Sequence, residues 1–191
     1  MNVIGITGTL GAGKGTIVDY LVQQKGFIHF SARGFLIEEI ERRGLKVDRD
    51  SMTTVANELR HSHSPSYIID QLYERAIKTG KPAVIESIRT FGEITSLRQK
   101  GHFLLLAVDA DPKIRYKRIA ERASETDKIS FETFIANEKR EMTSDDPNKQ
   151  NLERCIREAD YLFINNGTIF ELIQQVETVL QKVTNGNELQ L

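Results

Sequence analysis

The sequence predicts an α/β protein in which helices cover both faces of a five-stranded, mostly parallel, doubly wound sheet. Short apolar runs, amphipathic segments between them and helix-start signals support this prediction. The runs are Val3 to Thr7, Phe27 to Phe30, Ala83 to Glu86, Phe103 to Val108 and Tyr161 to Ile164. Most are nearly continuous rather than alternating, which is typical of strands that are buried on both faces.

The segments between these runs have helical periodicity. Apolar residues recur at helical spacing in residues 52–59, 69–76 and 170–183. Ser64-Pro65 has the pattern of a helix N-cap followed by proline, and Thr168-Ile169-Phe170-Glu171 has the spacing of a capping box. Strands that alternate with helices in this way favour a parallel sheet.

Two helical insertions interrupt the alternation, within what we expect to be one domain spanning residues 1–191. Residues 33–79 hold about three predicted helices between the second and third strands. Residues 115–157 are helical, polar and highly charged, and lie between the fourth and fifth strands. Because extra helices at one end of a parallel sheet are where flaps over ligands are built, we expect both insertions to cover a binding site.

The composition excludes several classes of protein. The net charge is −1, with 39% hydrophobic and 28% charged residues, so no global signal points to nucleic-acid binding. No apolar run approaches the ~20 residues that a membrane span needs, so we expect no membrane partner. The single cysteine, Cys155, and the lack of a signal-peptide pattern make us expect a cytoplasmic protein. Monomer and homodimer both remain open.

A glycine-rich loop, residues 8–16, lies directly between the first predicted strand and a helix. Glycines let backbone N–H groups converge on phosphate oxygens, and the helix start adds its dipole. We therefore expect Lys14 to reach the β- and γ-phosphates of ATP and Thr16 to act on the Mg²⁺ side. The predicted ATP contacts in this loop are Gly8, Gly11, Ala12, Gly13, Lys14, Gly15 and Thr16.

The third predicted strand ends in Glu86, and Arg89 follows in the next turn. A carboxylate there points into the crevice beyond the strand ends, where ligands bind in such sheets. We expect Glu86 to hold Mg²⁺, through water, or to accept a proton, and Arg89 to grip an acceptor phosphate or carboxylate. The alternative is a strand-end glutamate beside a helix-capping arginine.

Further arginines are candidates for binding anions. Arg33 and Arg60 are assigned to the acceptor, with a solvated surface arginine as the alternative for each. Arg115, Arg118 and Arg122 are spaced to share one helix face, and such a stripe repels itself unless an anion lies against it. The transferred phosphate is its natural partner, so we assign Arg115 and Arg118 to catalysis and Arg122 to the acceptor. The alternative is a solvated face paired with nearby acids.

The position of Thr16 after Lys14-Gly15 resembles the phosphate loop of nucleoside monophosphate kinases such as the adenylate kinases. Val84 to Arg89, Asp109 to Ile119 and Ala159 to Thr168 resemble segments of the small dephospho-CoA kinase-like and deoxynucleotide kinase-like ATPases. Glu86 stands where nucleotide kinases have the aspartate of D-G-x-x-R. By this resemblance Arg33 meets the acceptor phosphate, Arg118 contacts ATP and Asn166 lines the adenine; a plain turn is the alternative for Asn166.

The resemblance covers nearly the whole chain and implies the P-loop NTPase fold and an ATP:acceptor phosphotransferase. It implies that residues 33–79 bind the acceptor and that residues 115–157 close as a lid. The leading hypothesis is a (deoxy)nucleoside monophosphate kinase that uses ATP and Mg²⁺ on a small nucleotide-like acceptor. The alternatives are a dephospho-CoA kinase, in which Glu86 is a general base toward a ribose hydroxyl, and a non-catalytic nucleotide-binding regulatory module. The identity of the acceptor stays open.

Overall fold

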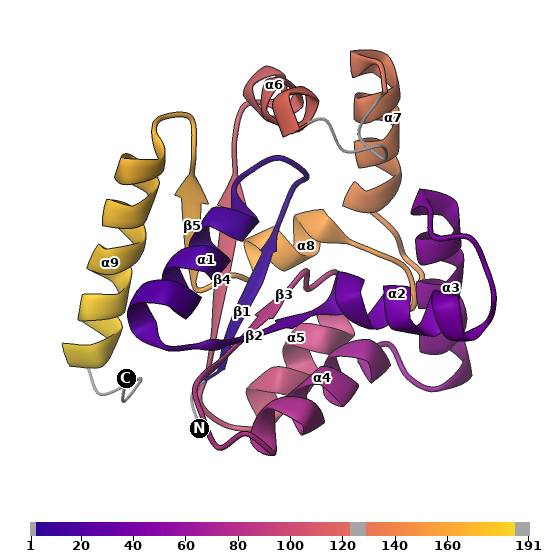
Figure 1. Cartoon of the computed structure of the whole chain (residues 1–191), viewed down its shortest axis with the longest axis horizontal. Coiled ribbons are helices and arrows are strands. Elements are labelled where there is room, and N and C mark those ends of the chain that lie inside the picture. The colour runs from indigo at the N-terminus through magenta and orange to yellow at the C-terminus, as the bar shows by residue number, and fades with distance from the viewer. Residues whose placement is uncertain (1–2, 123–128, 186–191) are drawn as a thin grey trace.

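The computed structural model describes residues 3–122 and 129–185, and its strands form a single parallel sheet (Figure 1). The strands are β1 (Val3–Gly8), β2 (Ile28–Ser31), β3 (Ala83–Glu86), β4 (Phe103–Asp109) and β5 (Tyr161–Ile164). Their order in the sheet is β2-β3-β1-β4-β5, and every neighbouring pair is parallel. The predicted strands are confirmed, each to within one residue at either end.

Helices connect the strands and cover both faces of the sheet (Figure 1). They are α1 (Lys14–Lys25), α2 (Ala32–Arg42), α3 (Arg49–Ser62), α4 (Tyr67–Ile77), α5 (Phe91–Gln99), α6 (Pro112–Arg122), α7 (Phe131–Met142), α8 (Leu152–Arg157) and α9 (Ile169–Asn185). Helices α1 and α9 pack on one face, whereas α4, α5 and α8 pack on the other. The predicted doubly wound architecture is therefore confirmed.

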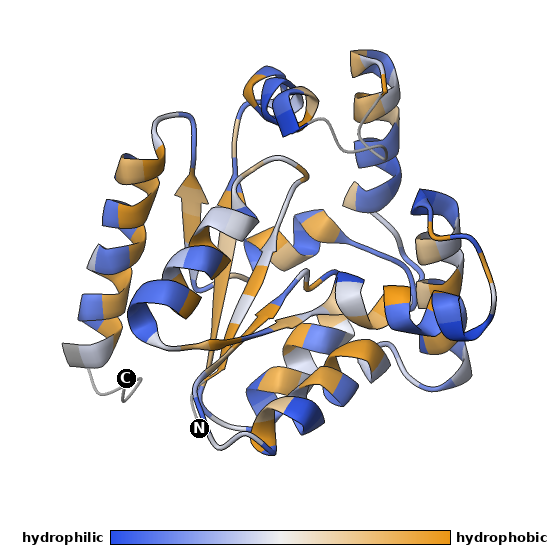
Figure 2. Ribbon diagram, in the orientation of Figure 1, coloured by the Kyte–Doolittle hydropathy of each residue, from blue (hydrophilic) through white to orange (hydrophobic). Residues whose placement is uncertain are grey.

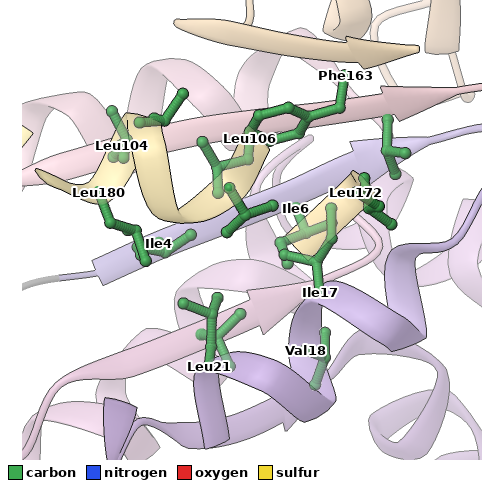
Figure 3. Close-up of a cluster of buried hydrophobic side chains, with 14 of the residues drawn as sticks. Ile4, Ile6, Ile17, Val18, Leu21, Leu104, Leu106, Phe163, Leu172 and Leu180 are labelled. Carbon is green, nitrogen blue, oxygen red and sulfur yellow. The ribbon is translucent and has the colours of Figure 1, made fainter. Parts of the chain in front are cut away.

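The sheet separates two hydrophobic cores. On the α1 and α9 face, Ile4, Ile6 and Leu106 of the central strands meet Ile17 and Leu172 of the helices (Figure 3). A second cluster on the opposite face joins the sheet to α2, α3, α4, α5 and α8. Figure 2 shows hydrophobic residues along the strands and hydrophilic ones on the outer sides of the helices. Burial on both faces explains why the strand sequences are continuously apolar.

The helix-start predictions had different outcomes. Thr168 and Glu171 form the expected capping box before α9, with the backbone N–H of Thr168 donating to Glu171 at 2.7 Å. The predicted start at Ser64-Pro65 is wrong, because α4 begins at Tyr67 with Ser66 at the N-cap. The carbonyl of Pro65 instead accepts a hydrogen bond from a threonine at the start of α5, so this proline belongs to the preceding turn.

Several helices lie in each of the two insertions. Residues 33–79 contain α2 apart from its first residue, together with α3 and α4. Residues 115–157 contain most of α6 together with α7 and α8, and residues 123–128 of this insertion lie outside the described residues. Over residues 3–122 and 129–185, no helix has both the length and the apolar composition needed to cross a membrane.

Candidate functional site

A cavity of about 580 Å³ lies at the carboxyl ends of β1, β2 and β3. Its charged lining residues are Lys14, Arg33, Arg49, Arg60, Glu86, Arg89, Arg118, Arg122 and Glu141. Seven of these nine are cationic, so the cavity has a large excess of positive charge. Its volume is typical of small-molecule sites, and its charge indicates an anionic ligand.

The glycine-rich loop forms one wall of this cavity. Gly11, Gly13, Lys14, Gly15 and Thr16 line it, whereas two further loop residues predicted to bind ATP, Gly8 and Ala12, are buried and do not. Gly8 has a φ of 136°, and a Cβ added there would overlap the backbone of β4. Gly13 has a φ of 114°, and its Cβ would crowd a side-chain amide from the β5–α9 loop. Only glycine fits these positions.

Lys14, the first residue of α1, is buried at the base of this loop. Its Nζ donates hydrogen bonds to the carbonyl oxygens of Gly8 at 2.9 Å and Thr9 at 2.8 Å. Burial, helped by the charge of Arg89, lowers the pKa of Lys14 to about 7, although Glu86 acts in the opposite direction. An anion beside Nζ would favour the charged form of this lysine.

Glu86 lines the cavity at the end of β3, as predicted, and is held by a residue that the sequence analysis missed. The Nε2 of His29 on β2 lies 3.1 Å from the Oε2 of Glu86. Burial alone would raise the pKa of Glu86, but the hydrogen bond from His29 and the charges of Lys14 and Arg89 hold it below its usual value. Glu86 is therefore an oriented, ionised carboxylate.

Arg89 lines the cavity and pairs with a carboxylate from α7. Its Nη1 donates to Oε2 of Glu141 at 2.8 Å and to Oε1 of Gln150 at 3.0 Å. Glu141 also accepts a hydrogen bond from Arg49 of α3. The N-cap of α5 is Thr90, so the alternative of a helix-capping Arg89 side chain is wrong.

Arg33 and Arg60 both line the cavity, but they differ in burial and in hydrogen bonding. Arg33 is exposed, and its side chain makes no hydrogen bond or ion pair with any other described residue. Arg60 is only 3% exposed, and its Nη2 donates to Oε1 of Glu93 at 3.0 Å. The other oxygen of Glu93 accepts the backbone N–H of Arg89 at 2.7 Å. The surface alternative for Arg60 is therefore wrong, and its ion pair supports the turn that carries Arg89.

The predicted arginine stripe on α6 is divided. Arg118 and Arg122 line the cavity, but Arg115 does not. Arg115 is 2% exposed, donates to the carboxylate of Glu138 on α7, and donates from Nε to the carbonyl of Ala110 at 2.7 Å. The position of Arg115 therefore does not support the predicted contact with the transferred phosphate, because the carboxylate of Glu138 is the anion that binds it. Arg115 holds α6 against α7.

The loop after β5 contacts the phosphate loop through Asn165, whereas Asn166 is the residue predicted to line the adenine. Asn165 is buried, and its Nδ2 donates to the carbonyl of Ala12 at 2.7 Å. Asn166 is exposed, accepts the backbone N–H of Asp111 at 2.8 Å and does not line the main cavity. Arg118 joins this loop to the cavity, since its Nη1 donates to the carbonyl of Asn165 at 2.9 Å.

Known proteins resemble this chain in sequence and in fold. The family described as AAA domain matches residues 4–144. A UPF0200 protein of Pyrobaculum aerophilum is 30% identical over 182 residues, which cover 94% of this chain and 97% of the relative.

Among solved structures, a Thermus thermophilus protein has a TM-score of 0.64 and 20% identity, covering 96% of this chain and 98% of its own. A gluconokinase from Sinorhizobium meliloti has a TM-score of 0.62 and 12% identity, covering 97% and 94%. A dephospho-CoA kinase from Campylobacter jejuni has a TM-score of 0.55 and 18% identity, covering 97% and 98%. At these identities the likeness shows the fold alone, and it confirms the predicted P-loop kinase-like fold. Because the family match and the relative both span most of the sequence, the chain belongs to the AAA domain family and to the UPF0200 proteins.

Proposed function

We propose that this protein is an ATP-dependent phosphotransferase whose acceptor is a small nucleotide-like molecule, with (deoxy)nucleoside monophosphates as the leading class. One observation carries the proposal: the phosphate loop with Lys14 and the acceptor-side residues Glu86, Arg89 and Arg33 line the same cavity. Phosphoryl transfer depends mainly on positioning donor and acceptor together and on neutralising their charge, and this arrangement supports both.

ATP fits the side of the cavity formed by the phosphate loop. Backbone N–H groups of the loop residues that line the cavity, 11 and 13–16, would bind its phosphates, with Lys14 beside them and Arg118 held at the neighbouring β5–α9 loop. Thr16 and Glu86 line the cavity with the oxygen donors that Mg²⁺ prefers. Within the described ranges, no cluster of three or more His, Cys, Asp or Glu residues could hold a metal by itself, which fits an ion that arrives with the nucleotide. Mg²⁺ would neutralise charge between the β- and γ-phosphates.

The acceptor fits the side formed by the first insertion. Arg33 at the start of α2 is exposed at the cavity, and its side chain makes no hydrogen bond or ion pair with another described residue, so its guanidinium is available to an anion. Arg89 and Arg122 supply further positive charge. Leu36, Met52 and other α2 and α3 residues add apolar surface on which a base can pack. Residues 115–157 would act as the lid. A cytoplasmic setting, where ATP is available, is part of this proposal.

A second candidate is a dephospho-CoA kinase-like reaction, in which the acceptor is a hydroxyl group. Glu86 favours this candidate, because His29 and Lys14 hold its carboxylate ionised at the cavity. A hydroxyl group must lose a proton during transfer and benefits from such a base, whereas an ionised phosphate acceptor does not need one. The neighbour in the fold comparison that is titled a dephospho-CoA kinase also supports it.

A coupled assay of ADP release tests the proposal. ATP and Mg²⁺ are combined with nucleoside monophosphates, deoxynucleoside monophosphates or dephospho-CoA, and with no acceptor as the control. We expect ADP release that depends on one of these acceptors. If the protein binds ATP but releases no acceptor-dependent ADP with any of them, the regulatory-module alternative is correct and the proposal is wrong.

A further inference from the structure

The carboxylate of Glu141 lies between two arginines on the cavity wall. It accepts hydrogen bonds from Arg49 and, at 2.8 Å, from Arg89, and all three side chains line the cavity. The Glu141 side chain is 17% exposed and that of Arg89 is 22% exposed, so the pair is partly desolvated. Two arginines converging on one carboxylate form a binding geometry that suits a phosphate group equally well.

The three residues come from three separate parts of the fold. Arg49 begins α3 in the first insertion, Arg89 follows β3, and Glu141 lies near the end of α7 in the second insertion. The carboxylate therefore ties the second insertion to the first across the cavity. It also forms an ion pair with Arg89, the arginine that a phosphate group of the acceptor would need.

The charges at this cluster do not balance. Glu141 contributes one negative charge to two guanidinium groups, and Lys14 lies close enough for its charge to interact with this carboxylate. Arg89 and Arg49 hold the pKa of Glu141 below its usual value even though burial acts to raise it, so the carboxylate is ionised. A phosphate dianion has more charge and one more oxygen, and would satisfy the two arginines better.

We infer that Glu141 is an internal substitute for the phosphate of the acceptor: it occupies an anion subsite formed by Arg49 and Arg89, and a phosphate dianion displaces it. This inference rests on the proposed function, which identifies the phosphate-bearing ligand as the acceptor. It makes Glu141 a specificity-determining residue, because acceptors that carry a phosphate dianion displace the carboxylate and neutral acceptors such as nucleosides do not. Displacement also breaks the tie between α3 and α7.

Binding of inorganic phosphate, measured by titration calorimetry, tests this inference without requiring turnover. Glu141→Gln keeps the shape of the side chain and removes the competing charge. We expect this variant to bind phosphate at least about tenfold more tightly, the factor expected from one charge-assisted hydrogen bond. The matched control is Glu132→Gln, an exposed acid on the first turn of the same helix, which we expect to bind phosphate as the wild type does.

Phosphate also binds at the phosphate loop, so a double variant identifies the subsite. Adding Arg49→Gln to Glu141→Gln should abolish the gain in affinity. Unchanged or weaker phosphate binding by Glu141→Gln would show that the carboxylate merely positions Arg89. A gain in affinity that survives the loss of Arg49 would place the phosphate site elsewhere. Either result overturns the inference. Failure of the proposed function would appear separately, as a lack of acceptor-dependent ADP release by the wild type.

Discussion

Binding of ADP to this protein is expected to take up a proton at Lys14. Burial and the charge of Arg89 lower the pKa of this lysine to about 7, so at pH 8 only about a tenth of the molecules carry the Lys14 charge. Phosphate oxygens beside Nζ would replace the carbonyl oxygens of Gly8 and Thr9 and return the pKa of Lys14 toward its ordinary value near 10.4. The protonated fraction then approaches one, and we expect an uptake of ~0.9 protons for each ADP bound at pH 8.

Titration calorimetry in two buffers of different ionisation enthalpy measures this uptake. At pH 8 the phosphates of ADP are already ionised, so the slope of binding enthalpy against buffer ionisation enthalpy reports protons taken up by the protein. Lys14→Arg is the control, because an arginine stays charged in both states and the slope should fall to about zero. A wild-type slope of zero, or an equal slope in Lys14→Arg, would refute the reasoning.

The same lysine sets a pH dependence of folding stability. Its folded pKa is lower than its unfolded pKa, so the unfolded chain binds more protons between about pH 7 and 10.4, and stability rises with pH in that window. Thermal unfolding without nucleotide should show a smaller rise for Lys14→Met than for the wild type. Equal rises in the two proteins would mean that Lys14 is not the responsible group.

Four further substitutions test other contacts, with Gly15→Ala as the control for Gly8→Ala. Glu93→Ala leaves the buried Arg60 unpaired and should lower the free energy of unfolding in urea by about 3–5 kcal/mol; a loss below ~1 kcal/mol would contradict the buried pair. Gly8→Ala should destabilise the protein and abolish ADP binding, because φ at this position is 136° and the added Cβ meets the backbone of β4. At Gly15 an added Cβ meets nothing within 4 Å, so Gly15→Ala should keep the melting temperature of the wild type. Arg33→Ala should raise the acceptor KM by about tenfold or more without moving the melting temperature, and an unchanged KM would remove this arginine from the acceptor site.

The strands and the phosphate loop could be predicted because their signals are local. Continuous apolar runs report burial on both faces, and glycines at residues 8, 11 and 13 report a loop with positive φ. The capping box at Thr168 is likewise decided by residues three apart. For Ser64-Pro65 a local signal failed, because a hydrogen bond to α5 draws this proline into a turn.

The partners of the site residues could not be predicted, because they depend on distant parts of the chain. His29 and Glu86 are 57 residues apart and meet only because β2 lies beside β3 in the sheet, an order that periodicity does not determine. Arg49 and Glu141 are 92 residues apart. Arg115 pairs with Glu138 of α7, a carboxylate 23 residues away that the spacing of the α6 arginines could not identify. Arg118 instead donates to backbone carbonyls of the loop after β5.

Transfer of label from γ-labelled ATP tests the central claim most directly. Wild-type protein, Mg²⁺ and a panel of nucleoside monophosphates, deoxynucleoside monophosphates and dephospho-CoA are incubated with the labelled nucleotide, and the products are separated by chromatography. We predict that label appears in one class of acceptor, and that Lys14→Ala abolishes the transfer while its circular dichroism spectrum stays that of the wild type. Label that never leaves ATP for any acceptor, or wild-type transfer by Lys14→Ala, would contradict the account.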